Sequence, residues 1–201
     1  MNPVELIALA ASTSLLAGWR LYLVTLITGI GMKFGWIALP DNLHALDVLA
    51  NNWVLGIAAV GTFMEFFADK IAWVDSAWDA IHSFIRPLGG ALLSLAIIDS
   101  ADPAWQIGSF LLGGGAALMA HAGKAGARTL VNASPEPFSN VLVSTGEDVA
   151  TGGLLALAIA NPIAAALIAF GLVLLSLWLV VAARRALSRL LERVNPKQPT
   201  A

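Results

Sequence analysis

The sequence predicts an all-α, polytopic membrane protein with about six transmembrane helices, some of them interrupted. Of its 201 residues, 58% are hydrophobic and only 12% are charged, whereas soluble domains carry about 25% charged residues. The mean hydropathy is +0.80. The chain contains no cysteine, which excludes disulfides and thiolate chemistry. Its formal net charge of -2 gives no reason to expect a nucleic acid partner.

The first apolar stretch runs from residue 4 to about residue 36. As a helix it would be about 45 Å long, which exceeds the hydrocarbon thickness of a bilayer. Gly18 and Arg20 interrupt it in the middle. We therefore predict a broken or steeply tilted helix with Arg20 near mid-depth.

Five further apolar stretches predict the remaining spans. They cover residues 53–68, 87–98, 104–121, 141–159 and 162–183, and the third and sixth open at Pro87 and Pro162. A charged amphipathic segment, 69–86, and a polar segment, 121–140, lie between spans. The glycine run 113–115 predicts close helix packing. We expect one transmembrane domain, 1–183, and a basic tail, 184–201.

The distribution of Lys and Arg predicts that both termini face the cytoplasm. The tail is rich in arginine, and its amphipathic pattern also suits anionic lipid. Predicted inner segments hold Lys70, Arg86, Lys124 and Arg128. Predicted outer segments hold only Lys33 as a cation, beside Asp41, Asp47, Asp99 and Asp102.

The two halves of the chain contain similar segments in the same order. An Ala-Gly-x-Arg sequence occurs at 17–20 and again at 125–128, each followed by a span with carboxylates. Three spans per half predict an inverted-topology repeat of 1–101 and 102–183, which many secondary transporters have. Chance recurrence in a chain rich in Ala and Gly is the alternative.

Ionisable side chains within apolar stretches are costly, so they indicate pairing or function. Glu65, Asp69 and Glu147 are candidate coupling carboxylates, and Arg20 and Arg128 are candidate ligands of an anionic substrate group. Asp148 is a further candidate for substrate binding or coupling, although as the neighbour of Glu147 it would point to a different helix face. Because a buried arginine needs a partner, we expect Arg20 to pair with a carboxylate of the second or fifth span, with Glu147 as first choice.

A second pattern lies in the amphipathic segment. Asp75, Asp79 and His82 follow at helical spacing and would share one face, so they could bind a divalent cation or relay protons. The alternative is a solvated helix face paired with Lys70 and Arg86. Otherwise we expect no cofactor, and the sequence contains no Walker loop, GxSxG, HExxH or CxxC motif.

The polar segment 121–140 predicts an anion or headgroup pocket beside a helix end. An ordinary cytoplasmic loop is the alternative. Its polar residues are His121, Lys124, Arg128, Asn132, Ser134, Glu136, Ser139 and Asn140.

Three of these segments resemble a known family. The residues are Asp75-Ser-Ala-Trp-Asp-Ala-Ile-His82 with Ile85-Arg-Pro87, Lys124-Ala-Gly-Ala-Arg128, and Ser134-Pro-Glu-Pro-Phe-Ser-Asn140. In them the chain resembles, over nearly its whole length, the bacterial membrane family called domain of unknown function 4126. The resemblance implies an integral membrane protein of this size, and it carries no catalytic residue with it.

Repeat-like halves, broken helices and buried charges favour a small proton- or cation-coupled transporter or flippase-like permease for an anionic or lipid-like substrate. One alternative is a metal-dependent enzyme acting on lipid phosphate, although the sequence leans away from an enzyme. Another is a non-catalytic assembly protein. The lipid bilayer is the expected partner, and a homo-oligomer stays open.

Overall fold

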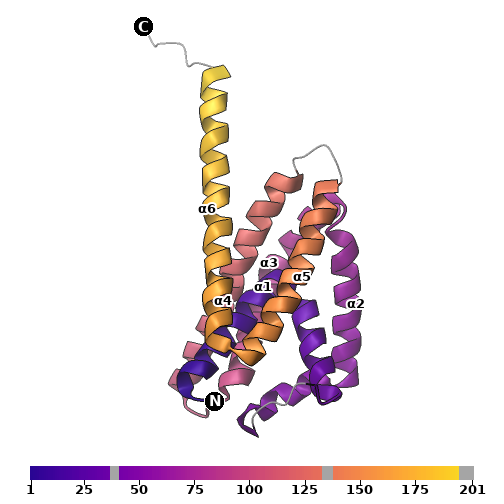
Figure 1. The fold of residues 1–201 in the computed structure, drawn as a ribbon, viewed down its shortest axis with the longest axis vertical. Coiled ribbons are helices and arrows are strands. Elements are labelled where there is room, and N and C mark those ends of the chain that lie inside the picture. Colours follow the sequence, from indigo (N-terminus) through magenta and orange to yellow (C-terminus); the bar gives the residue numbers. More distant parts are fainter. Residues whose placement is uncertain (37–40, 133–137, 195–201) are drawn as a thin grey trace.

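The computed structural model describes residues 1–36, 41–132 and 138–194, and these form helices without a strand. The elements are α1 (Pro3–Lys33), the 3-10 helix η1 (Asp41–Ala50), α2 (Asn52–Ala68), α3 (Ala72–Ile98), α4 (Pro103–Asn132), α5 (Phe138–Ala160) and α6 (Pro162–Val194). Figure 1 shows α1 in the middle of the bundle, with the other helices around it.

Helices α1 and α2 begin where polar side chains accept hydrogen bonds from free backbone amides. At α1, Asn2 and Glu5 form a reciprocal capping box, which satisfies two amides that a helix N-terminus leaves unpaired. Asn51 accepts from the amide of Trp53 at α2. The predicted start of the last helix at Pro162 is confirmed.

Helix α1 is broken, as predicted, at Arg20, whose φ of -142° and ψ of 69° are not helical. The break divides α1 into an N-terminal arm, 3–19, and a C-terminal arm, 21–33. Figure 1 shows both ends of α1 at the lower end of the bundle, so the chain rises along one arm and returns along the other.

Neighbours on α3 establish this reversal. Along the N-terminal arm, Leu6 shares a small cavity with Ile98, and the Ser14 hydroxyl donates to the carbonyl of Gly90 at 2.9 Å. That arm is antiparallel to α3. The C-terminal arm runs the other way.

Along this second arm, Leu21 lies against Gly89, and Thr25 lines a cavity with Leu93 and Ala96. Here the residue numbers rise in the same direction along both helices, from 21 to 25 in α1 and from 89 to 96 in α3, so the C-terminal arm runs parallel to α3. The first apolar stretch is therefore a helical hairpin with Arg20 at its tip, which sequence reasoning did not predict.

Helices α3 and α4 are longer than predicted. Pro87 does not open a span but lies inside α3, which also includes most of the segment predicted as a separate amphipathic element. Helix α4 continues to Asn132, so residues 121–132 are helix and not loop. Residues 133–137, including Ser134 and Glu136, lie outside the described residues, as does the end of the tail after residue 194.

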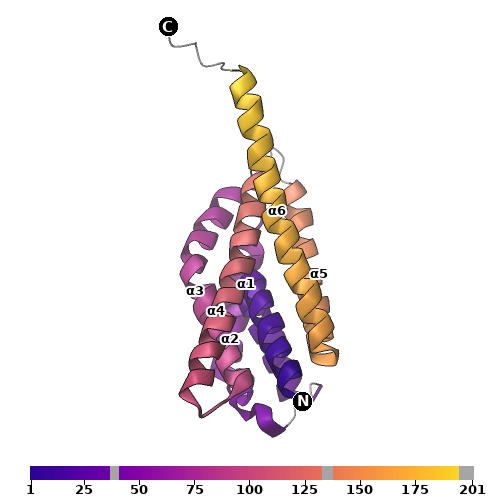
Figure 2. The ribbon, with the colours of Figure 1, turned by 90° about the vertical axis from the view of Figure 1, so that its left-hand side faces the viewer.

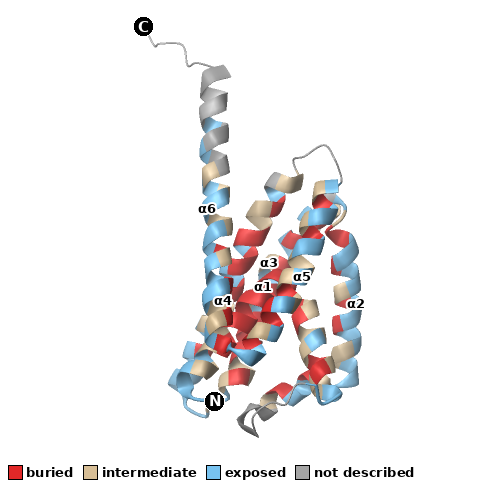
Figure 3. Ribbon diagram, in the orientation of Figure 1, coloured by how far each residue is buried: buried red, intermediate tan, exposed pale blue. Residues whose placement is uncertain are grey.

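Polar side chains concentrate in the interior, and apolar side chains cover the outside. Exposed aromatic residues on α2 include Trp53 and Phe63, and α6 exposes Leu167 and Trp178, while Figure 3 shows buried positions around α1. An apolar exterior of this extent suits lipid. Within the residues that the structure describes, four helices are long and apolar enough to cross a membrane, beginning at residues 3, 73, 138 and 162. The predicted total of six is not confirmed.

The two ends of the bundle differ. Figures 1 and 2 show the N-terminus at the lower end and the C-terminal part of α6 at the upper end, beyond the other helices. The two described ends of the chain thus lie at opposite ends of the bundle, and the predicted location of both termini on one side of a membrane is not confirmed. The inverted repeat stays unconfirmed, since Arg20 lies at a break whereas Arg128 lies within the continuous α4.

Candidate functional site: a buried ionic cluster

The tip of the α1 hairpin carries Arg20 into the interior, where its side chain is only 1% exposed. Its guanidinium donates to the Asp69 carboxylate at the end of α2. From α5, Glu147 Oε2 lies 3.3 Å from Nη2 and Asp148 Oδ1 lies 3.0 Å from Nε. Nη2 also donates to the Ser144 carbonyl at 3.1 Å. The predicted ion pair of Arg20 with Glu147 is thus confirmed. Because Glu65 Oε1 also lies 4.0 Å from Nη1, four carboxylates share one guanidinium.

The tip reaches this depth because small residues precede it. Gly18 lies against the Ala117 carbonyl and the Ala120 side chain of α4, and no Cβ could fit there. The close approach of α1 to α4 therefore depends on this glycine.

A second buried arginine, Arg86 of α3, binds the other predicted coupling residue. Its Nη2 donates to Glu65 Oε1 at 2.5 Å and its Nη1 to Asp79 Oδ1 at 3.0 Å. His121 of α4 lies 2.6 Å from Nη1 through its Nδ1. Since Nη1 can only donate, the Nδ1 of His121 must be the acceptor. Arg86 thus joins α2, α3 and α4.

Lys124 of α4 lies between the two arginine systems. Its Nζ lies 3.7 Å from Glu65, 3.6 Å from Asp69 and 3.9 Å from Glu147, and it donates to the Trp19 carbonyl at 3.3 Å. Lys124 therefore joins the carboxylates of α2 with the carboxylate of α5.

Arg128 lies one helical turn further along α4. Its Nε donates to both carboxylate oxygens of Asp75, at 3.3 and 3.2 Å. Its Nη2 donates to the Asp69 carbonyl, and its Nη1 donates to the Asn140 carbonyl at 3.4 Å. The region predicted as an anion pocket thus supplies an arginine that holds helix ends together.

Carboxylates outnumber cations in this buried ionic cluster. Among the described residues, the ion pairs connect four cations with six carboxylates, an excess of two negative charges when all are ionised. The members are Arg20, Arg86, Lys124, Arg128, Glu65, Asp69, Asp75, Asp79, Glu147 and Asp148. The side chains of Glu147 and Asp148 are 19% and 27% exposed, more than the other eight. The least buried part of the cluster is therefore acidic.

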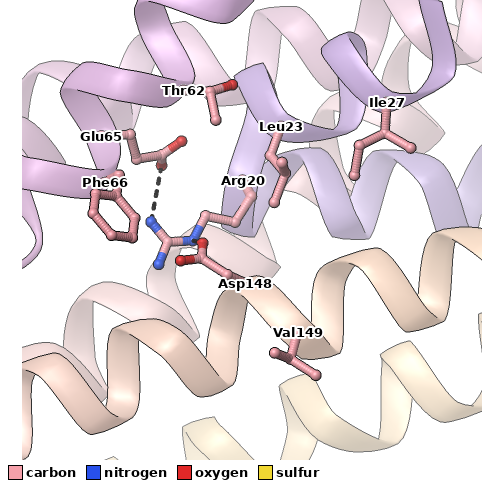
Figure 4. Close-up of a pocket in the computed structure, with 8 residues that line it drawn as sticks. All are labelled: Arg20, Leu23, Ile27, Thr62, Glu65, Phe66, Asp148 and Val149. Atoms are coloured by element: carbon pink, nitrogen blue, oxygen red, sulfur yellow. Dashed lines mark ion pairs between the residues drawn. The ribbon is translucent and has the colours of Figure 1, made fainter. Parts of the chain in front are cut away.

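A cavity of about 370 Å³ adjoins this acidic part. Figure 4 shows that its wall comes from the C-terminal arm of α1, from α2 and from α5. Its polar end contains Arg20, Glu65 and Asp148, and the rest is mainly apolar. The lining residues are Arg20, Leu23, Ile27, Thr62, Glu65, Phe66, Asp148 and Val149. A molecule in this cavity would touch both the cluster and apolar side chains.

The predicted metal residues do not meet at a common point. Asp75 binds Arg128 and Asp79 binds Arg86. The ring of His82 stacks on Trp78 with centroids 4.2 Å apart. In the described part of the chain, no three carboxylates or histidines are grouped to hold a metal ion.

Sequence reasoning missed the pairing roles of Arg86, His121 and Lys124. It considered Arg86 as a partner on a solvated helix face and placed His121 and Lys124 in an anion or headgroup pocket. A signal was present, because Lys124 and Arg128 are four residues apart and so share a face of one helix. This shared helix face was overlooked because residues 121–140 were predicted to be a polar segment between spans and not part of a helix.

Interior charges linked across five helices beneath an apolar exterior define the class of this molecule, a helical membrane protein with a buried ionic cluster. The chain belongs to the family described as Domain of unknown function (DUF4126), whose model matches residues 7–182. No curated protein and no solved structure matches it.

Proposed function

We propose that this protein is a small permease that couples movement of its substrate to protons or cations. The observation that carries the proposal is the acidic part of the cluster beside a cavity. Glu147 and Asp148 are partly exposed, and the cluster has two more carboxylates than cations. Uncompensated carboxylates in an apolar protein require protons or cations, so their occupancy can follow a gradient.

The arrangement of helices supports the same proposal. Both halves of the chain contribute charges to the cluster, with Arg20, Asp69 and Arg86 from the first half and Lys124 and Glu147 from the second. Broken helices that end at a central charged site are typical of secondary transporters. Paired charges without any cavity would instead favour a structural assembly protein.

An anionic substrate gains no support from the geometry. Arg20 is surrounded by four carboxylates, and Arg128 binds Asp75 and two carbonyls. An anion would have to displace these partners. We therefore retain Glu147 and Asp148 as coupling residues and assign Arg20 and Arg128 to holding them in place.

For topology, we propose that the hairpin enters and leaves the bilayer on the outer side. The basic segments predicted to face the cytoplasm then keep that orientation, and only the N-terminus changes side. In a bacterial inner membrane, Lys33, Asp47 and the turn at Asp99 would face outward, and the end of α6 would face the cytoplasm.

The test uses the purified protein in liposomes that contain a pH-sensitive dye. A panel of solutes is added with and without an imposed pH gradient, and a solute that moves protons identifies the coupled substrate. Glu147→Gln should abolish the gradient dependence. The matched control is Glu5→Gln, because Glu5 is a partly buried acid in the first turn of α1, outside the cluster, and a glutamine can keep its capping role. If no solute of the panel moves protons, or if Glu147→Gln still couples, the permease proposal is refuted.

A further inference from the structure

We infer that the cavity between α1, α2 and α5 binds an amphiphilic organic cation, with its charged group against Asp148 and Glu65. This inference rests on the proposed function and names the substrate class of its site. Four observations support it: an unpaired acceptor, the local charge, the apolar wall and the way in.

The acceptor is Oε2 of Glu65. Glu65 is 1% exposed; its Oε1 pairs with Arg86, but its buried Oε2 has no hydrogen-bond partner. In Figure 4 this second oxygen points away from Arg20, into the space between Thr62 and Leu23. An unpaired carboxylate oxygen costs free energy when buried, so a donor or a positive charge placed there would be stabilised.

The charge at the polar end is negative. Asp148 and Glu65 line the cavity with one cation, Arg20, and Arg20 pairs with Asp69 and Glu147 as well as with these two carboxylates. A monocation placed beside Asp148 would reduce the excess of carboxylates, whereas an anion would increase it.

Three cations lie near this end without lining the cavity. Arg86 and Lys124 pair with Oε1 of Glu65, at 2.5 and 3.7 Å. Lys70 donates to the Phe66 carbonyl at 2.9 Å, and its Nζ lies 3.2 Å from the centroid of the Phe66 ring. The charged group of the ligand would therefore lie against Asp148 and the unpaired Oε2 of Glu65, with Phe66 in the adjoining wall.

The rest of the cavity wall is mainly apolar, so it favours a ligand whose uncharged part is apolar. Leu23 and Ile27 of α1, with Val149 of α5, extend from the polar end. Val149 is 71% exposed at the edge of the cavity, and Phe66 is 41% exposed. Since the exterior of these helices is apolar, a ligand that partitions into lipid can reach the cavity from the side. These features together describe a quaternary ammonium or phosphonium amphiphile.

The experiment measures binding of radiolabelled tetraphenylphosphonium to the full chain in lipid nanodiscs. Tetraphenylborate, which has the same shape and the opposite charge, serves as competitor. We expect saturable binding of the cation without competition by the anion. Asp148→Asn and Glu65→Gln should each weaken binding about 10-fold or more, as expected for the loss of a charged partner. Glu5→Gln should leave binding unchanged.

A second variant tests the place of binding with the charges intact. Val149→Trp fills the edge of the cavity from an exposed position, so folding is preserved, and tryptophan fluorescence during heating checks this. Binding should fall by a similar factor. Unchanged affinity in Val149→Trp and Asp148→Asn, absence of saturable binding, or equal binding of tetraphenylborate would overturn the inference.

The binding result and the flux result separate the two proposals. Binding that depends on Asp148 without coupled proton movement supports this site and refutes the permease. Proton movement driven by another solute, together with no binding of tetraphenylphosphonium, refutes this site and leaves the permease standing.

Discussion

Replacing Arg20 by methionine tests whether the hairpin tip holds the bundle together. The substitution keeps a long side chain but removes the charge that four carboxylates share. At 3.0 Å, the separation of Arg20 and Asp148, two unit charges attract by about 5 kcal/mol if the effective dielectric constant is about 20. Desolvation opposes this attraction, and removing one partner of a buried pair costs about 3–5 kcal/mol in total.

For a chain of this length, that loss lowers the melting temperature by about 10 °C. Tryptophan fluorescence during heating of the protein in nanodiscs measures it, with the exposed Arg185 as matched control through Arg185→Met. The double variant Arg20→Met with Asp69→Asn should recover about 1–3 kcal/mol, because it removes one of the stranded carboxylates. If Arg20→Met melts like Arg185→Met, or if the two substitutions are additive, Arg20 does not stabilise the cluster.

Two further predictions concern packing and topology. Gly113→Ala should destabilise the protein by about 1–3 kcal/mol, because the new Cβ would meet the Gly90 carbonyl. Gly115→Ala, where the new Cβ meets open space, should be neutral or slightly stabilising. The melting temperatures of the two variants test this, and equal effects would contradict the packing at Gly113. Reporter proteins fused before Met1 and after Ala201 should be active on opposite sides of the membrane, the first outside and the second in the cytoplasm, and activity on the same side would exclude the hairpin.

The sequence predicted those features that depend on the cost of a buried charge. The break near Gly18 and the pairing of Arg20 with Glu147 both followed from an arginine in an apolar stretch too long to cross once. The reversal of direction at Arg20 could not be predicted, because hydropathy is the same for a helix that crosses and for one that returns. Only its partners on α3 reveal the reversal.

The longer helices were missed for a related reason. Lys124 and Arg128 resemble loop residues in a hydropathy profile, but each is neutralised by carboxylates from α2, α3 or α5, and a helix tolerates them once they are paired. Pairing between distant segments is invisible to local composition. The cavity was equally out of reach, because its wall combines three segments of the chain.

The hairpin tip also orders events during synthesis. Arg20 leaves the ribosome long before its counter-ions, since Asp69 follows 49 residues later and Glu147 follows 127 residues later. Until α5 exists, this guanidinium has no full set of partners, and an apolar environment would penalise it. The N-terminal segment must therefore wait near the membrane surface, or beside an insertion factor, and reach its final position only after most of the chain has been made.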